Sequence, residues 1–395
     1  MRLFWGLFTL LLTTDICLAG EYGNLNIRLH QILKDNVDGI DGLDNARQVV
    51  LSEDEKSAYV VSADDNSVAV FNIAPSFQLS LRQVLRSDET KLKLEGAVSV
   101  VTDKKTNQVY VLSFYDGALT RFSLDAGGKL KFEQEISDDL SPQRVFKDTR
   151  PISLLEDTYG LLGGYHMTLN EKSAKLLVAA TISDSLSIFN IERDGRLVFQ
   201  HAIRGRDYPA IKGVVSVAVT GGSDRLSVAS MAGNAITFID KNTKGKYSLG
   251  ETITNGMDGI QELKAPAHLV SSTDGQFLFI ANMESSGVIV LKKNQHNRYR
   301  HFQTINKDDD NGTVGVGHVS ISADGKMMAI SSELAHTIKL YGADRHGKWH
   351  LNGEISSKTV VGIKIEAPTS TAFTENSKFV LVTFDEGDAL HVYKL

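Results

Sequence analysis

A five-residue pattern occurs seven times along the chain, and it constrains the fold more than any other feature of the sequence. Each copy alternates apolar with other residues and ends on a large apolar side chain, which is the period of a half-buried β-strand. The seven copies are Ser67–Phe71, Ala118–Phe122, Ser185–Phe189, Ala235–Ile239, Gly287–Leu291, Thr337–Tyr341 and Ala389–Tyr393. Strand-containing repeats of about 50 residues are typical of propellers.

Each repeat contains further strands around this pattern. The alternating run His318–Ser322 is followed by a turn that contains Gly325, and Phe277–Ala281 shows the second strand of a repeat. A fourth strand is expected at Leu197–Ile203 and at Trp349–Ile355. Four antiparallel strands make a propeller blade. The sequence therefore predicts an all-β fold, a seven-bladed β-propeller with four-stranded blades.

The last repeat ends directly after its third strand, at Leu395. The segment Asn24–Leu33 has the pattern of a strand without a partner nearby in the sequence. We predict that this N-terminal strand completes the last blade and closes the ring, which removes exposed sheet edges. Residues 20–395 are then expected to form a single domain.

The first 19 residues read as a signal peptide. One positive charge is followed by the apolar run Leu3–Leu12 and by small residues, and the run is too short to span a bilayer. Cleavage after Ala19 predicts a periplasmic or secreted protein. Lipid anchoring at Cys17 is disfavoured because Ile16, and not a small residue, precedes it. No later apolar run is long enough for a membrane span, and the mature chain would contain no cysteine.

The overall charge limits the class of partner. The net charge is −6 and the isoelectric point is near 6.0, with basic residues scattered among the acidic ones. Binding to a phosphate backbone needs clustered Lys and Arg, so nucleic acid is not expected. We expect a monomer that binds a small molecule or a protein.

One polar position per repeat defines a candidate site. Counting back 19 residues from the first residue of each pattern gives seven polar residues, here called the ring residues: Gln48, Ser99, His166, Ser216, His268, His318 and Ser370. The first strand of a propeller blade lines the central channel, so the ring residues should meet at one mouth. We expect a ligand there to contact Gln48, Ser99, Ser216 and Ser370 together with Arg47. The three histidines are open to several roles, namely polar groups in a wet channel, acid–base groups or metal ligands.

Metal binding is not favoured by the sequence. Zinc ligands must lie about 2 Å from one point, and the blade of Ser216 is expected to separate His166 from His268. Acidic loops occur at Asp38, Asp41 and Asp44 and at 308–310, but neither has the spacing of a calcium loop. We therefore expect no metal and no other cofactor, and solvated acidic loops are favoured over Ca²⁺ sites.

The spacing between successive ring residues is 50 to 52 residues except for one interval of 67, between Ser99 and His166. This places an insertion of about 16 residues between blades two and three, within 137–164. Arg144 and Arg150 lie in it and could bring positive charge over the channel. A tolerated loop and a functional loop both remain open.

The repeats resemble a known family. Ala267–Asn282 resembles the "S-P-D-G-x-x-x-Y-V-A-N" repeats of the YVTN and lactonase-like seven-bladed propellers, and Asp41–Ser52 resembles their "D-G-L-x-G-A-R-x-V-x-x-S" segment. The resemblance covers the whole mature chain and implies the propeller fold. It does not by itself imply an activity, because such folds have many functions.

Members of this family that hydrolyse lactones carry P-R-H with a following N-E, and H-x-H with a following P-D. The corresponding residues here are 266–268 with Asn282-Met283, and 164–166 with Ala179-Ala180, so the histidines are kept and the Arg, Glu and Asp are replaced. We therefore expect a non-enzymatic extracytoplasmic propeller that binds a ligand or partner protein at the channel mouth. The alternative is a lactone hydrolase in which His166, His268 and His318 are catalytic and Arg47 or an arginine of the insertion stabilises developing negative charge.

Overall fold

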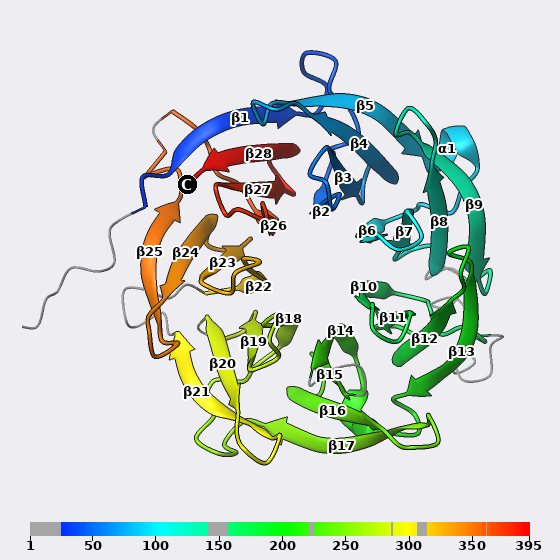
Figure 1. Cartoon of the computed structure of the whole chain (residues 1–395), viewed down its shortest axis with the longest axis vertical. Coiled ribbons are helices and arrows are strands. Elements are labelled where there is room, and N and C mark those ends of the chain that lie inside the picture. The colour runs from blue at the N-terminus through cyan, green and yellow to red at the C-terminus, as the bar shows by residue number, and fades with distance from the viewer. Residues whose placement is uncertain (1–24, 141–156, 221–224, 286, 306–313, 361) are drawn as a thin grey trace, which may run out of the picture.

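The computed structural model describes residues 25–140, 157–220, 225–285, 287–305, 314–360 and 362–395. In these residues the alternating segments form seven antiparallel sheets of four strands, arranged in a ring (Figure 1). The predicted all-β, seven-bladed propeller is confirmed. The signal peptide predicted at residues 1–19 and most of the insertion, including Arg144 and Arg150, lie outside the described residues.

The blades follow one another along the chain. Blade 1 comprises β2 (Ala46–Leu51), β3 (Ser57–Ser62), β4 (Ser67–Ile73) and β5 (Leu79–Arg86). Blade 2 comprises β6 (Ala97–Asp103), β7 (Gln108–Ser113), β8 (Ala118–Leu124) and β9 (Leu130–Ser137). Blade 3 comprises β10 (Gly164–Asn170), β11 (Lys175–Ala180), β12 (Ser185–Ile191) and β13 (Leu197–Arg204). Blades 4 and 5 comprise β14 (Val214–Thr220), β15 (Arg225–Ser230), β16 (Ala235–Lys241) and β17 (Tyr247–Thr254); and β18 (Pro266–Ser271), β19 (Phe277–Asn282), β20 (Val288–Lys293) and β21 (Tyr299–Ile305). Blades 6 and 7 comprise β22 (Val316–Ile321), β23 (Met327–Ser332), β24 (Thr337–Ala343) and β25 (Trp349–Ile355); and β26 (Pro368–Phe373), β27 (Phe379–Phe384), β28 (Ala389–Lys394) and β1 (Arg28–Lys34). A helical turn, α1 (Ser87–Thr90), and a 3-10 turn, η2 (Pro209–Ile211), lie in connections between blades.

The strand order of each blade sets two faces of the ring. First strands such as β2 and β14 lie nearest the centre, and fourth strands such as β5 and β17 lie outermost (Figure 1). At one face, here called the mouth face, each fourth strand connects to the next blade and each second strand turns into the third. The turns after the first and third strands lie at the opposite face. Each ring residue therefore sits near the mouth face, at the start of a first strand.

The N-terminal strand closes the ring as predicted. β1 is the outermost strand of blade 7 and pairs antiparallel with β28, with Leu29 opposite Tyr393 and Lys34 opposite Ala389 (Figure 1). The strand begins at Arg28, four residues after the predicted start.

Apolar side chains fill the spaces between blades. All residues of the second strands β3, β7, β11 and β15 are buried, because neighbouring blades cover both faces of these strands. The large apolar residue that ends each five-residue pattern lies in this core, and Phe71, Phe122 and Phe189 have no exposed surface. Burying such a side chain stabilises the fold by roughly 1.5–3 kcal/mol.

Glutamines on several outer strands join neighbouring blades. The amide of Gln83 on β5 donates to the carbonyl oxygen of Leu130 at 3.2 Å and accepts from the N–H of the same residue at 2.7 Å. The same reciprocal pair joins Gln31 to Leu79, Gln134 to Leu197 and Gln303 to Trp349. Gln31 lies on β1, so the closing strand also ties blade 7 to blade 1.

In the described residues no helix is long and apolar enough to cross a membrane. The insertion between blades 2 and 3 is anchored at its two described ends. Asp138 accepts hydrogen bonds from the N–H groups of Thr158 and Tyr159, and Arg204 forms an ion pair with Asp157 at 2.7 Å.

We expect Gln83→Leu to lower the free energy of unfolding by about 1–3 kcal/mol, since it removes two interblade hydrogen bonds and leaves the Leu130 N–H and carbonyl without partners. Equilibrium denaturation would measure the change. The matched control is Ser76→Ala on the exposed turn of the same blade, for which we expect almost no change. Equal effects of the two substitutions would contradict the interblade role of Gln83.

Candidate functional site

The ring residues lie at one end of the channel, but not all of them line a cavity there. A cavity of about 60 Å³ lies there and is lined by Arg47, Gln48, Val98, Ser99, Tyr165, His166, Ala267, His268, Met283, Gly317, His318, Glu333 and Thr369. Five of the seven ring residues are among them. Ser216 and Ser370 are buried and do not line the cavity, although the sequence predicted that they would contact a ligand.

The ring residues also have a structural role. In five of them the side chain accepts a hydrogen bond from a main-chain N–H of the next blade. The donor is the residue directly after the ring residue of that next blade. The bonds are Gln48 from Val100 (2.7 Å), Ser99 from Met167 (3.3 Å), His166 from Val217 (3.3 Å), Ser216 from Leu269 (3.0 Å) and Ser370 from Val49 (3.1 Å). A polar residue is therefore needed at this position to join successive blades around the channel, whatever ligand the mouth binds.

His268 and His318 depart from this pattern. Their Nδ1 atoms are buried and make no hydrogen bond of normal geometry in the described part of the chain. The main chain of Val319 is close to His268. Buried polar atoms of this kind are uncommon in folded proteins and call for an explanation.

The three histidines are in contact with one another. The ring centroids of His166 and His268 lie 4.8 Å apart at nearly a right angle, and those of His268 and His318 are stacked 4.3 Å apart. The expectation that the blade of Ser216 separates His166 from His268 is wrong, because the first strands converge on a channel narrow enough for side chains to cross it. Ser216 instead lies beside His166, with its hydroxyl 3.2 Å from Nδ1.

The site keeps these histidines neutral. Burial lowers the pKa of His166 to about 4 and that of His318 to about 3. Burial, followed by repulsion from His318 and His166, holds the pKa of His268 well below its ordinary value. Because Nδ1 of His166 accepts the N–H of Val217, a neutral ring carries its proton on Nε2. His166 is thus a hydrogen-bond donor through Nε2 and a poor metal ligand through that atom.

Arg47 lines the same cavity and is held by two carboxylates. Its guanidinium lies 3.2 Å from Glu333 and 3.3 Å from Asp385, and it also contacts the hydroxyl of Tyr165. Burial opposes the charge of Arg47, but Glu333, Tyr165 and Asp385 raise its pKa above the ordinary value. Burial raises the pKa of Glu333, although Arg47 favours its ionised form. An arginine, two carboxylates and neutral histidines therefore share one small site.

Glu333 and Asp385 were missed in the sequence, although a signal for them exists. Glu333, Asp385 and Met283 each directly follow the second strand of their blade, which is the position of the Glu in the family's N-E motif. Arg47 likewise directly precedes a ring residue, as the Arg of P-R-H does. The family's motif places the Arg and the Glu in the blade of His268, whereas here the two groups come from blades 1 and 6.

The carboxylates around Asp41 are paired with an arginine. Asp35, Asp41 and Asp65 place carboxylate oxygens within 4.8 Å of one another, and the guanidinium of Arg86 donates to Asp41 and Asp65 at 2.5 to 2.7 Å. A Ca²⁺ ion at this point would have to displace Arg86. Asp38 is exposed, and residues 308–310 lie outside the described part of the chain.

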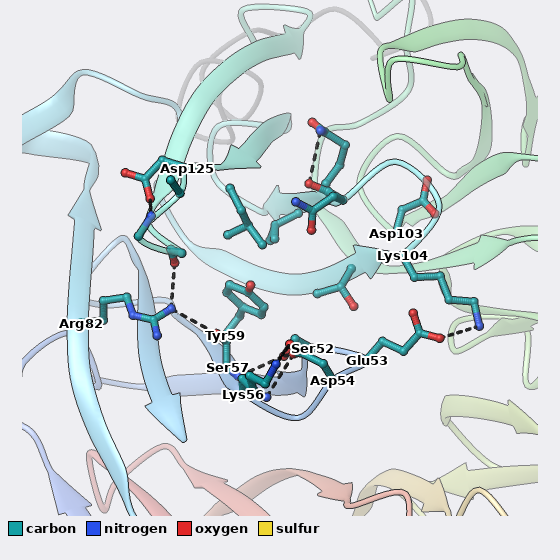
Figure 2. Close-up of a pocket in the computed structure, with 18 residues that line it drawn as sticks. Ser52, Glu53, Asp54, Lys56, Ser57, Tyr59, Arg82, Asp103, Lys104 and Asp125 are labelled. Atoms are coloured by element: carbon teal, nitrogen blue, oxygen red, sulfur yellow. Dashed lines mark hydrogen bonds and ion pairs between the residues drawn. The ribbon is translucent and has the colours of Figure 1, made fainter. Parts of the chain in front are cut away.

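A larger groove, of about 490 Å³, lies between blades 1 and 2 at the opposite face (Figure 2). Its polar groups are bonded within the turns that form it. Arg82 donates to Ser57 at 3.2 Å and to the carbonyl of Gly128 at 3.0 Å, and Lys104 pairs with Glu53 at 3.3 Å (Figure 2). No histidine is among the residues that line the groove. The smaller cavity at the mouth, which brings three histidines together with Arg47 and Glu333, is therefore the better candidate for chemistry.

Comparison with known families gives one match. Residues 216–395, which form blades 4 to 7 up to the C-terminal strand, match the family described as Lactonase, 7-bladed beta-propeller. The chain is thus similar to lactonase-like seven-bladed β-propellers over these residues, and the ring of seven blades shows that it shares their fold. No curated protein matches the sequence.

Solved structures of similar fold cover most of the chain. A candidate 6-phosphogluconolactonase from Bacteroides uniformis is 16% identical, with a TM-score of 0.61 over 88% of this chain and 91% of that one. A candidate 6-phosphogluconolactonase from Bacteroides fragilis is 16% identical, with a TM-score of 0.60 over 88% and 89%. A periplasmic gluconolactonase from Pseudomonas aeruginosa is 10% identical, with a TM-score of 0.59 over 82% and 86%. At these identities the likeness is one of fold alone.

We expect the mouth histidines to remain uncharged well below neutral pH. Nuclear magnetic resonance of ¹⁵N-labelled histidine should show no titration of His166 or His318 between pH 8 and pH 5, because their pKa values lie near 4 and 3. The spectrum of His166 should also be that of the tautomer with hydrogen on Nε2. Titration of His166 near its ordinary value of 6.5 would contradict the assignment.

A second pH effect is expected at the junction of blades 7 and 1. Burial, followed by repulsion from Asp388 and Asp65, raises the pKa of Asp44 from 3.8 to about 6. A raised carboxyl pKa stabilises the fold below the ordinary pKa, and this contribution is lost as the pH rises through the raised value. Asp44→Asn should therefore stabilise the protein at pH 7.5 and lose this advantage between pH 6 and pH 4. Denaturation at several pH values measures the difference, with exposed Asp38→Asn as the control.

Proposed function

We propose that this propeller hydrolyses an uncharged lactone at the mouth of its channel. One observation carries the proposal: the arginine and glutamate that the family's motifs require are present as Arg47 and Glu333, and both line the cavity of His166, His268 and His318. The family match to residues 216–395 supports the same reading.

The residues of the cavity suit the steps of lactone hydrolysis. Water attacks the lactone carbonyl carbon, and Glu333, whose pKa is raised by burial, takes the proton from that water as general base. The carbonyl oxygen gains negative charge, which Arg47 and the Nε2–H of His166 stabilise. The ring C–O bond then breaks, and Glu333 returns the proton to the ring oxygen. The product is an open hydroxy acid.

The charges around the mouth favour an uncharged substrate. Arg47 is already neutralised by Glu333 and Asp385, and Asp44, Asp64 and Asp388 lie close by on blades 1 and 7. A phosphorylated lactone would meet repulsion there, and the described residues that line the cavity offer it no cation other than Arg47. The signal peptide predicted at residues 1–19 is consistent with this, since it would place the protein in the periplasm or outside the cell, away from phosphosugars.

The second candidate function is binding of a ligand or partner without catalysis. It is favoured by the size of the cavity, since about 60 Å³ holds two or three waters, whereas small-molecule sites usually measure about 300–1,000 Å³. Only the carbonyl end of a lactone would fit into a cavity of this size, and the rest of the ring would stay outside it. Turnover decides between the two functions.

We expect purified protein to open at least one member of a panel of uncharged γ- and δ-lactones, measured by acid release. Glu333→Gln should lower kcat/KM by about 100-fold or more, because the base is lost while the side-chain shape is kept. His166→Phe should lower kcat/KM by about tenfold or more through loss of the Nε2–H donor.

The matched control is His296→Ala, an exposed residue of the β20–β21 turn in the blade of His268, which should leave kcat/KM unchanged. Far-ultraviolet circular dichroism checks that each variant folds. Absence of turnover across the whole panel, or turnover that survives Glu333→Gln, would rule out this mechanism.

A further inference from the structure

Exposed apolar side chains concentrate on the mouth face. Of the eight large hydrophobic residues with high exposure among those described, six lie in connections at that face: Val37, Tyr115, Tyr208, Met257, Val314 and Leu334. The other two, Ile32 and Phe132, lie on outer strands, and none lies in the described turns of the opposite face. Single exposed apolar residues are ordinary, whereas neighbouring exposed apolar residues that form a patch mark an interaction surface.

Three of these residues form an arc over blades 4 to 6, here called the apolar arc: Met257, Val314 and Leu334. Leu334 has the highest exposure, 67%, and its side chain abuts Gly315, the neighbour of Val314. Half-buried Met231 lies in a turn of the same sector. Methionine is flexible and polarisable, so a methionine-rich surface adapts to side chains of different shapes.

The other side of the mouth, over blades 7 and 1, is acidic. Asp38, Asp44, Asp64, Glu386 and Asp388 form this acidic arc, and no described basic side chain forms an ion pair with any of them. The raised pKa of Asp44, which is caused by burial and by Asp388 and Asp65, indicates that these carboxylates repel one another. Within the described residues, the acidic arc is therefore not neutralised by direct ion pairs.

The opposite face carries the balancing charge. Its turns hold exposed basic residues such as Lys105, Lys244, Lys246 and Arg298. A net charge of −6 thus combines one strongly acidic face with a more basic one. Such a field orients a cationic partner towards the mouth face as it approaches and repels anions from it.

From the two arcs we propose that the mouth face docks a basic, amphipathic polypeptide segment. Lysine or arginine side chains of the segment would pair with the acidic arc, and its apolar side chains would pack on the apolar arc. An anionic lipid surface does not fit, because it would meet the carboxylates. The proposal rests on surface residues outside the catalytic cavity and does not depend on lactone hydrolysis.

Calorimetric titration with synthetic peptides tests the proposal. The probe is a lysine–leucine peptide with leucines at helical spacing, and the comparison peptides are one of the same composition without that spacing and a glutamate–leucine analogue. We expect the first to bind most tightly, with affinity that falls as salt rises. Leu334→Ser should weaken its binding by about tenfold. Asp38→Asn with Asp64→Asn should weaken binding and reduce its dependence on salt.

Matched controls lie elsewhere on the ring. Phe132→Ser on the outer strand β9 and Glu192→Gln in an opposite-face turn should leave binding unchanged. The proposal is overturned if no peptide binds, if Leu334→Ser and Phe132→Ser bind alike, if the peptide without helical spacing binds equally well, or if anionic vesicles bind and the peptide does not. Lactone turnover, measured on Leu334→Ser and Phe132→Ser, should be unaffected, so failure of one proposal is separate from failure of the other.

Discussion

Each blade of this propeller depends on its neighbours, and the hydrogen bonds that cross from blade to blade hold the ring together. Around the channel, a ring residue of one blade accepts the N–H that follows the ring residue of the next, as Ser216 does from Leu269. Near the outer wall, glutamines such as Gln134 form reciprocal pairs with the next outer strand. Apolar packing between the sheets is not directional, whereas these bonds fix how far each blade is rotated against the next.

The same dependence explains the chemistry available at the mouth. Five of the seven ring residues accept an N–H from the next blade, and serine, glutamine and histidine each do so at one or more positions. Histidine adds a second nitrogen that points away from the bond, so a structural requirement leaves a donor available in the channel. His166 shows this clearly, since its Nδ1 is used between blades while Nε2 keeps the proton.

The fold could be predicted because the same strand pattern occurs seven times in the sequence. The ring residues could be located because each lies 19 residues before the first residue of its pattern. The site was harder to predict. A motif search within one blade assumes that neighbouring sequence means neighbouring space, but a closed ring brings Arg47 next to Glu333, 286 residues away. For the same reason the contact of His166 with His268 could not be derived from blade order. Ser216 and Ser370 were expected to face a ligand because both are polar. The sequence alone does not distinguish a polar side chain that bonds to the next blade from one that faces the channel.

Closure by the first strand has a consequence for how the molecule comes into being. Blades 1 to 6 are each continuous in the chain and could pair internally as soon as they are made, but β1 has no partner until β28 exists. Pairing them closes a loop that spans nearly all of the described chain, at an entropic cost that grows only slowly with length. A growing chain therefore carries an unsatisfied edge at its beginning for almost the whole of its synthesis, and assembly is completed in one late step.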